Sequence, residues 1–293
     1  RQGAKPNFIG CNFETNTSME DGGAIFCGRD SKPKIENCTF IGNQSTSGSG
    51  GAIAVNEGVP EIISCTFNSN EAGDGSGGAI SINESQGVTI RLSTFNGNTA
   101  EEGGAVNMYQ AKDIQFTQSH FEYNSANFGG GVYIEESGMS VVPISFSNCI
   151  LGNNTAYYEG GAIYSSQSSQ FVSFLNFDYC TMTGNTAEAG GASSYGGGIS
   201  IKINNNLTVS NSIIWNNTAD DDPEISFHPT NTITISYSNV KGGWAGEGNI
   251  DADPLFENST TGDLHLKSES PCKGAGEGGS DMGAFGGISG DWM

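Results

Sequence analysis

The chain repeats one short pattern at nearly constant intervals, and this period constrains its fold more than any other feature. The pattern is an apolar residue, two variable residues and an asparagine, as in FIGN from Phe40 to Asn43. Successive copies are separated by 27, 27, 28, 26, 30, 31, 32 and 26 residues. A period of this length indicates a solenoid in which each repeat forms one coil. Eight copies begin at Phe13, Phe40, Phe67, Phe95, Phe121, Leu151, Met182 and Ile214, and a ninth, degraded copy without the asparagine begins at Val240.

Other columns of residues keep the same phase. The residue two positions before each copy is always Cys or Ser, and the residue five positions before it is always apolar. Paired glycines follow most copies, and an alternating stretch such as Ile80-Ser81-Ile82 comes next. A period of two indicates β-strands. We therefore expect three strands per coil, which in the second coil lie around Ile35, from Cys38 to Ile41 and from Ala52 to Asn56.

These columns predict an all-β fold, a right-handed parallel β-helix (solenoid) of about nine coils. The repeats occupy residues 1–248, and residues 249–293 form a modified C-terminal capping and assembly segment. A globular β-sandwich also uses many short strands, but it does not repeat its side chains in register. Right-handedness is expected because parallel crossover connections are almost always right-handed.

Stacking in a parallel solenoid explains which residue types recur. Residues one period apart lie about 4.8 Å apart, so Phe40 stacks on Phe67 and Asn43 on Asn70. We expect the Phe column to fill the core. We expect the Asn column to occupy a left-handed bend and to bond from coil to coil. The Cys column should hold buried free thiols, because stacked parallel Cβ vectors are poorly aimed for disulfides.

The charge balance restricts the partners. Asp and Glu number 32 against 11 Lys and Arg, which gives a net charge of −21. Such a surface repels nucleic acid and anionic lipid, whereas cations, basic partners and neutral polymers are tolerated. No apolar run approaches the ~18 residues that a membrane span requires. The chain begins inside the repeat pattern, so we expect a mature or excised segment.

Acidic residues gather just before the paired glycines, and stacking would align them into an edge. Carboxylate oxygens are the ligands that Ca²⁺ prefers. The alternative is a solvated edge that keeps the rod soluble, and no recognisable calcium-binding loop supports the metal. We expect no cofactor other than this candidate calcium. The densest candidate ligands are Glu101, Glu102, Asp220, Asp221 and Asp222.

Catalytic groups are sparse. A polysaccharide lyase needs a base, and a glycoside hydrolase needs paired carboxylates at a defined separation. Arg91, Lys112, Lys202 and Lys241 are scattered singly. We expect His120 to point outward alone, and His228 and His265 have no evident partners in the sequence. The sequence predicts no catalytic residues, and a pocket with two carboxylates and a base on one face would favour an enzyme instead.

A column of threonines is expected on the outside of the coils. Thr39, Thr66, Thr94 and Thr181 share this position, and His120, Ile150 and Ile213 interrupt it. Regular threonine arrays can bind ice, but the interruptions make β-propensity the better explanation.

The repeated Phe-x-x-Asn and Gly-Gly-Ala-Ile motifs resemble the passenger repeats of polymorphic outer-membrane protein autotransporters, over roughly residues 8–240. That resemblance implies a surface-exposed β-helix, commonly an adhesin. The segments NIDADPLF, GDLHL, SPC, GAG and DMGAF between Asn249 and Gly287 resemble the C-terminal end of secreted bacterial β-helix proteins. This second resemblance implies a cap over the core, and both imply an exported protein.

The two ends of the chain differ in charge. Residues 1–34 hold five bases and four acids, a net of +1, whereas residues 247–293 hold two bases and nine acids, a net of −7. Complementary ends suit head-to-tail contact, which can run on as a fibre. Phe8 at the head and Trp292 and Met293 at the tail are the expected assembly residues. The alternative is that Trp292 folds back on its own chain.

These observations predict a secreted or cell-surface structural or adhesive protein without catalytic activity. The expected partners are further copies joined end to end and a carbohydrate or other cell-surface ligand. The competing prediction is a polysaccharide lyase or glycoside hydrolase that acts on extracellular carbohydrate.

Overall fold

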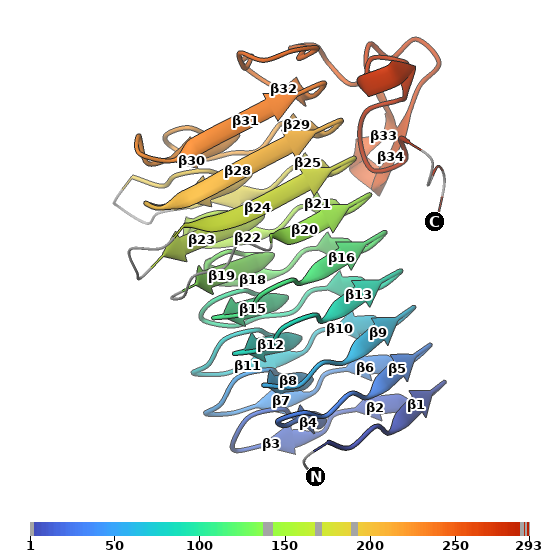
Figure 1. Ribbon diagram of the computed structural model, residues 1–293, viewed down its shortest axis with the longest axis vertical. Helices are drawn as coiled ribbons and strands as arrows, with labels where there is room; N and C mark the ends of the chain where they lie inside the picture. The colour runs from blue at the N-terminus through green and yellow to red at the C-terminus, as the bar shows by residue number, and fades with distance from the viewer. Residues whose placement is uncertain are drawn as a thin grey trace.

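A computed structural model describes residues 3–136, 143–167, 172–188, 193–287, 290 and 292. In this part of the chain, short strands wind into stacked coils that form one rod (Figure 1). Neighbouring coils pair through parallel strands, so the expected parallel β-helix is confirmed. None of the helices among these residues is long and apolar enough to cross a membrane.

The first sheet carries the apolar column that lies five residues before each repeated motif. Its register places Phe8 beside Ile35 and Ile90 beside Phe116, as the period predicts. Over the described residues it has nine strands. They are β1 (Asn7–Ile9), β5 (Lys34–Glu36), β9 (Glu61–Ile63), β13 (Thr89–Arg91), β16 (Gln115–Thr117), β20 (Ile144–Ser147), β24 (Ser173–Asp178), β28 (Asn205–Ser210) and β31 (Thr232–Ser236).

The second sheet carries the Phe column. Phe67 pairs with Phe40 on one side and with Phe95 on the other. Nine strands make up this sheet as far as the structure describes it. They are β2 (Asn12–Glu14), β6 (Thr39–Ile41), β10 (Thr66–Asn68), β14 (Thr94–Asn96), β17 (His120–Glu122), β21 (Ile150–Gly152), β25 (Thr181–Thr183), β29 (Ile213–Trp215) and β32 (Asn239–Val240).

The third sheet follows the paired glycines. Its strands are β4 (Ile25–Cys27), β8 (Ile53–Asn56), β12 (Ile80–Asn83), β15 (Val106–Tyr109), β19 (Val132–Glu136), β23 (Ile163–Gln167), β27 (Ile199–Ile201) and β30 (Ile225–Phe227). Short strands also pair at the corner before it. They are β3 (Thr17–Ser18), β7 (Gln44–Ser45) and β11 (Glu71–Ala72) in the lower coils, and β18 (Ser125–Phe128), β22 (Thr155–Glu159) and β26 (Thr186–Ala187) above them.

The predicted columns form one continuous core. The rings of Phe13, Phe40, Phe67, Phe95 and Phe121 stack with centroids 4.7–4.8 Å apart. The thiols of all seven cysteines are free, and only Cys11 among them is not buried. The second glycine of each pair must be glycine where coils touch, because a Cβ on Gly51 would lie 2.2 Å from the carbonyl oxygen of Gly78.

The asparagine column is a buried ladder of amides. The Nδ2 of Asn70 donates to the Oδ1 of Asn98 at 2.9 Å and to the carbonyl of Phe40 at 3.0 Å. The backbone N–H of Asn70 donates to the same Oδ1 at 3.0 Å. This arrangement repeats from Asn43 to Asn185, so the coil-to-coil bonding predicted for the column is confirmed.

One detail of the predicted column is wrong. The left-handed bend lies at the residue before each asparagine, for example at Gly42 (φ 60°) and Ser69 (φ 54°). The asparagine itself needs its amide turned inward, and the preceding residue takes the strained conformation that makes this turn. Variable residues therefore carry the strain, and the asparagine is selected for its hydrogen bonds.

A carboxylate ends the ladder. The Nδ2 of Asn217 donates to Oε2 of Glu224 at 2.6 Å, and its backbone N–H donates to Oε1 at 3.3 Å. Glu224 stands where Ala52 and Ala79 stand in earlier coils, and it is 7% exposed. Burial raises the pKa of the Glu224 carboxyl, and the hydrogen bonds from Asn217 oppose this shift. The last amide of the ladder thus keeps an acceptor where the column of asparagines stops.

The loop that follows β32 lies at the C-terminal end of the rod (Figure 1). Trp244 packs against the core, with its ring 5.6 Å from that of Phe227. The backbone N–H of Ile250 donates to the carbonyl of Ser238 at 3.0 Å, which adds one more rung to the second sheet. The tail beyond this rung leaves the end of the rod.

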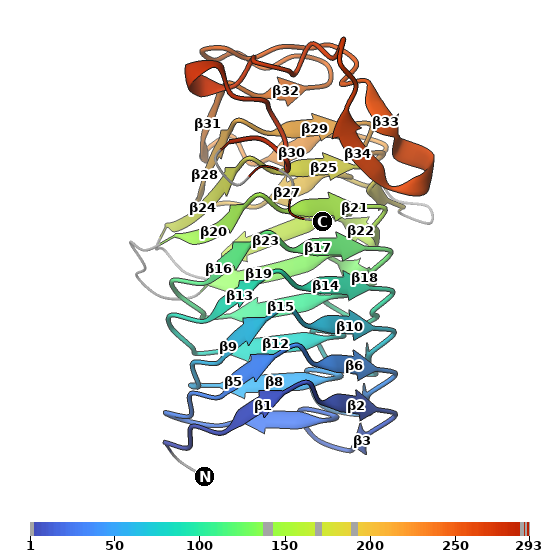
Figure 2. The same ribbon diagram turned by 90° about the vertical axis from the view of Figure 1, so that its right-hand side faces the viewer.

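The tail then folds back along the outside of the second sheet (Figure 2). Its antiparallel strands β33 (Phe256–Asn258) and β34 (Asp263–Leu266) are joined by the 3₁₀ turn η1 (Ser259–Thr261), and a second turn, η2 (Glu277–Gly279), follows. The backbone N–H of Gly283 donates to the carbonyl of Asn211 at 2.7 Å, and that of Ala284 donates to Oγ1 of Thr181 at 3.0 Å.

This lateral packing explains the interrupted threonine column. Ile150 and Ile213 point outward from the coils, and the tail buries both completely. Burial of such a side chain contributes about 1.5–3 kcal/mol. The segment expected to serve in capping and assembly therefore also fixes three upper coils from the side.

We expect Asn70→Ala to lower the free energy of unfolding by about 1–3 kcal/mol, because it leaves buried donors on Asn43 without an acceptor. The matched control is Asn68→Ala, which removes an exposed amide two residues away. Urea denaturation of the control should agree with the parent within about 0.5 kcal/mol. Equal stability of both variants would contradict the role of the ladder.

Glu224→Ala should destabilise the fold by about 1–3 kcal/mol, because Asn217 loses its acceptor, whereas Glu224→Gln keeps one. Because the folded-state pKa of Glu224 is raised, its ionisation weakens the folded state. Relative to the glutamine variant, the parent should be most stable below the ordinary pKa of glutamate. This advantage should fall as the pH rises through the folded-state pKa. Denaturation midpoints across the acidic range measure it, and a difference that grows with pH would refute the assignment.

Candidate functional site

The outer face of the third sheet is built from side chains that alternate with the core. In β12 and β15, Ile80, Ile82, Val106 and Met108 point inward and are fully buried. The residues between them face outward and lie in register across the coils. This outward column runs Ala54, Ser81, Asn107, Tyr133 and Tyr164.

A hollow of about 210 Å³ lies on this face over the lower and middle coils. The small side chains of Ala54 and Ser81 leave space above the sheet, and Tyr133 closes the upper end. Residues from the corner before the third sheet line one side of the hollow, and residues at the ends of its strands line the other side. The lining consists of Asp21, Ser49, Ala54, Val55, Asn56, Ser76, Ser81, Asn83, Glu102, Asn107, Tyr109, Tyr133 and Glu135.

Two amide groups in the hollow lack hydrogen-bond partners within the described part of the chain. The side chain of Asn107 is 5% exposed on the floor, and it bonds to no other described group. The Oδ1 atom of Asn83 is buried and accepts no hydrogen bond from a described group. Buried polar groups are normally satisfied, so the Asn83 Oδ1 requires water or a hydroxyl group of a ligand, and the Asn107 amide is available to the same molecules.

Two carboxylates border the same hollow. The Oγ of Ser76 donates to Glu102 at 3.2 Å, and the hydroxyl of Tyr133 donates to Glu135 at 3.2 Å. Burial raises the pKa of Glu102, and the hydrogen bond from Ser76 opposes the shift. Burial also raises the pKa of the Tyr133 phenol, which stays a neutral donor. The hollow therefore combines hydroxyl and amide groups with acceptors that have no basic partner.

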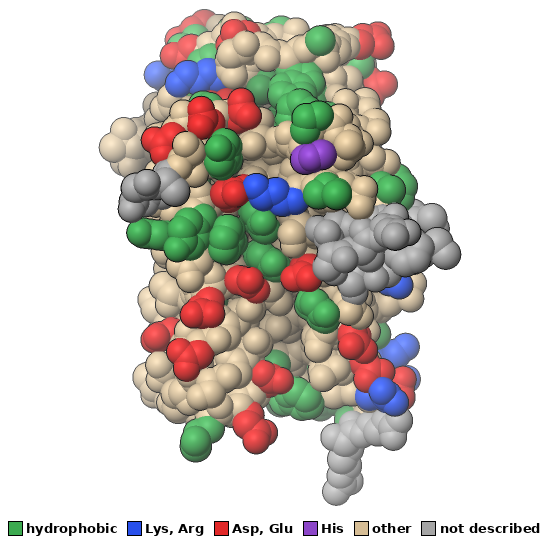
Figure 3. All heavy atoms as spheres, turned by 90° about the vertical axis from the view of Figure 1, so that its left-hand side faces the viewer, with side chains coloured by type: hydrophobic (Ala, Val, Ile, Leu, Met, Phe, Trp, Pro, Cys, Tyr) green, Lys and Arg blue, Asp and Glu red, His purple; other side chains and the backbone are tan. Residues whose placement is uncertain are grey.

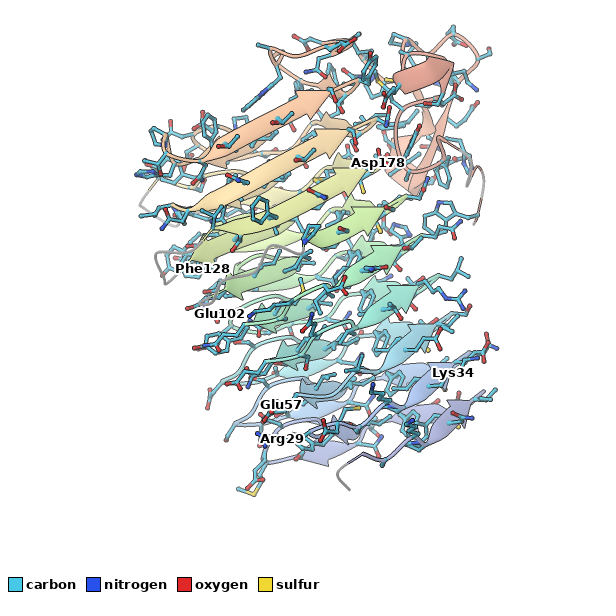
Figure 4. All side chains as sticks on the ribbon, in the orientation of Figure 1. Arg29, Lys34, Glu57, Glu102, Phe128 and Asp178 are labelled. Atoms are coloured by element: carbon cyan, nitrogen blue, oxygen red, sulfur yellow. The ribbon has the colours of Figure 1, made fainter. Side chains whose placement is uncertain are left out.

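Aromatic rings continue this face above the hollow. Tyr133 stacks on Tyr164 with centroids 5.4 Å apart, and Phe128 lies 5.1 Å from Tyr164 and 5.0 Å from Tyr158. Figure 3 shows the mixture of acidic and hydrophobic side chains on this side of the rod, and Figure 4 places Phe128 above Glu102 along the same edge. The amine of Lys202 lies over the Tyr164 and Tyr195 rings and pairs with Glu159.

The predicted acidic edge is not a continuous stack. Glu102 pairs with Ser76 below it and Phe128 above it, and Asp221 pairs with Tyr195. Four coils, or about 19 Å, separate Glu102 from Asp221. In the described ranges, no three His, Cys, Asp or Glu side chains gather closely enough to hold a metal ion. Calcium binding stays a prediction, and in the described structure its candidate ligands do not form a metal-binding cluster. These candidates are Glu101, Glu102, Asp220, Asp221 and Asp222.

The assembly residues are placed as follows. Phe8 is half-buried at the first coil, where its ring meets the edge of Phe13 at 5.8 Å. Trp292 does not extend away from the rod, since its Nε1 donates to the carbonyl of Ala284 at 3.0 Å and its ring packs near Phe285. Met293 lies outside the described residues. End-to-end association stays a prediction, and of the two alternatives for Trp292 the structure has the one in which it folds back on its own chain.

The histidines have neighbours that the sequence did not reveal. Nε2 of His120 lies 3.3 Å from Glu122. Nδ1 of His228 lies 2.8 Å from the Thr230 hydroxyl. Nδ1 of His265 lies 2.7 Å from Asp263, and its ring stacks on Phe285. None of the three lines the hollow in the described structure.

Sequence reasoning missed most of the hollow, including Asn83, Asn107, Tyr109, Tyr133 and Glu135. The signal was present in the outward positions of the strands that follow the paired glycines. These positions change from Ala and Ser to Asn and Tyr along the rod, whereas most inward positions stay apolar. The repeat period alone gives no reason to single out one coil. The sequence therefore predicts only that inward and outward residues alternate in these strands.

Comparison with known proteins agrees with the geometry. A family profile described as a right-handed β-helix region matches residues 1–177, more than half of the chain. A search of curated proteins found no match. The match and the stacked parallel coils together confirm the predicted right-handed parallel β-helix, and the chain belongs to the right-handed β-helix family.

Proposed function

We propose that this protein is an extracellular, non-catalytic adhesive β-helix that binds a carbohydrate chain along the outer face of its third sheet. One observation carries the proposal. The Asn83 Oδ1 is buried in a surface hollow without a hydrogen-bond partner, and the largely buried Asn107 lines the same hollow with no side-chain hydrogen bond to a described residue. Binding sites typically combine a few such polar groups with aromatic walls.

The surroundings of these groups suit a sugar. Hydroxyl groups of a saccharide can both donate and accept, which matches an amide, a serine hydroxyl and two carboxylates in one hollow. Tyr109 is 38% exposed beside them, and an aromatic face can cover the apolar side of a pyranose ring. The outward column changes from Ala54 and Ser81 to Asn107 and Tyr133 along the rod, so a polysaccharide along this face would meet small, polar and aromatic side chains in turn.

A hydrolase is the second candidate, because Glu102 and Glu135 face the same hollow and the pKa of Glu102 is raised by burial. Paired carboxylates are the groups that glycoside hydrolysis uses. A lyase has less support, because the described lining contains no Lys, Arg or His to serve as the base. Release of reducing ends from a bound polysaccharide would favour the hydrolase over the adhesin.

Asn107→Ala and Tyr109→Ala should each weaken polysaccharide binding at least about tenfold, or about 1.4 kcal/mol. Asn107→Ala should leave the melting temperature unchanged or raise it, because the buried amide it removes has no partner. Retention on a panel of immobilised neutral and charged polysaccharides measures binding. Tyr123→Ala, which removes an exposed ring outside the hollow, is the control. Failure of the parent chain to bind any member of the panel would overturn the proposal.

Association of copies end to end is an additional prediction from the charge difference between the two ends of the chain. Since Trp292 packs on its own chain, removal of residues 288–293 should leave any such association unchanged. Added salt should weaken the association, because salt screens exposed charges. Light scattering at high concentration measures both effects, and a monomer under all conditions would exclude the filament.

A further inference from the structure

We propose that the hollow on the third sheet selects sugars that carry a protonated amine, so that its ligand is a hexosamine polymer with free amino groups. This inference rests on the proposed carbohydrate-binding function and names the class of its ligand. It depends on three features of the hollow, namely its charge, its unpaired amides and its aromatic wall.

The charge of the hollow has one sign. Asp21, Glu102 and Glu135 line it, and the described lining includes no basic side chain. The groups that donate hydrogen bonds to these three carboxylates are neutral. Asp21 accepts from the backbone N–H of Ser49 at 2.8 Å, while Ser76 and Tyr133 donate to the two glutamates.

Some acids elsewhere on the rod have a basic partner, although 32 acids cannot all pair with 11 bases. Glu57 pairs with Arg29, and Glu159 pairs with Lys202 just above the hollow. The chain has 11 Lys and Arg residues in all. On the described surface some of these bases neutralise neighbouring carboxylates, while the carboxylates of the hollow keep no cationic partner. An ammonium group on a ligand would be such a cationic partner. Its charge-assisted hydrogen bonds to the carboxylates are stronger than neutral ones.

The carboxylates alone would bind any cation. The amides and the aromatic ring of the hollow also need a ligand with hydroxyl groups and an apolar face. Asn107 is 5% exposed on the floor between the columns of the two glutamates, and its amide makes no hydrogen bond to a described residue. A hexosamine offers hydroxyl groups to Asn107 and Asn83, an apolar ring face to Tyr109 and an ammonium to Glu102 or Glu135. A uronic acid polymer would place its carboxylates against those of the hollow, and like charges repel.

The test compares three oligosaccharides of equal length by calorimetric titration, namely a β-1,4-linked glucosamine oligomer, its fully N-acetylated form and an oligogalacturonate. The buffer is mildly acidic, so that the sugar amines are charged. The parent chain should bind the glucosamine oligomer at least about tenfold more tightly than the acetylated form, and the oligogalacturonate most weakly.

Glu102→Gln and Glu135→Gln should remove most of this preference while they retain binding of the acetylated oligomer. Glu101→Gln is the matched control, because Glu101 precedes Glu102 but does not line the hollow. The melting temperature of every variant confirms that the fold is intact.

The outcomes separate the inference from the function on which it rests. Equal binding of the amino and acetylated oligomers would overturn the amine preference and leave carbohydrate binding standing. No binding of any oligomer by the folded parent would overturn both. A lysine-rich peptide of equal charge that binds as tightly as the glucosamine oligomer would show that the hollow recognises charge alone, and it would overturn the assignment to a sugar.

Discussion

The structure depends on the buried ladder of asparagine amides. Each amide in the middle of the ladder makes one bond to the next coil and one to the carbonyl of the coil before, and its oxygen accepts two bonds in return. In a dry interior such bonds are strong, and a missing partner is expensive. The ladder fixes the register of every coil, because a shift of one residue would leave each amide unpaired.

A ladder of this kind has a direction, so its last donor needs an acceptor that is not another asparagine. Glu224 supplies it from the position that alanine holds in earlier coils. The same need for a defined end appears in the buried Cys and Ser column. Asn249 takes the place of the Cys and Ser column, accepting from the Ser238 N–H at 3.0 Å and donating to the Ile235 carbonyl at 2.9 Å. The fold thus closes its internal columns with single polar substitutions.

Because the core columns carry the stability, the outward positions are free to change from coil to coil. On the second sheet this freedom produces Ile150 and Ile213, which receive the returning tail. On the third sheet it produces a hollow in which Asn107 is buried without a partner beside two carboxylates. Stable neighbours hold this amide in place, so its unmet hydrogen bonds are available to a ligand. The rod separates the residues that hold the coils together from those that face other molecules.

The period of the sequence by itself determined the parallel coils, the Phe stack, the Asn ladder and the free thiols, because residues one period apart are forced into contact. It did not place the left-handed bend correctly, because Gly42 and Ser69 share no residue type that marks the strained position. Only the tertiary structure decided where the tail lies, since its contacts join residues such as Asn148 and Ala284, 136 positions apart, without any repeat to relate them. The hollow was likewise decided in three dimensions. Ala54, Ser81, Asn107 and Tyr133 are ordinary outward residues one by one, and they form a site only because successive coils stack them on one face beside Glu102.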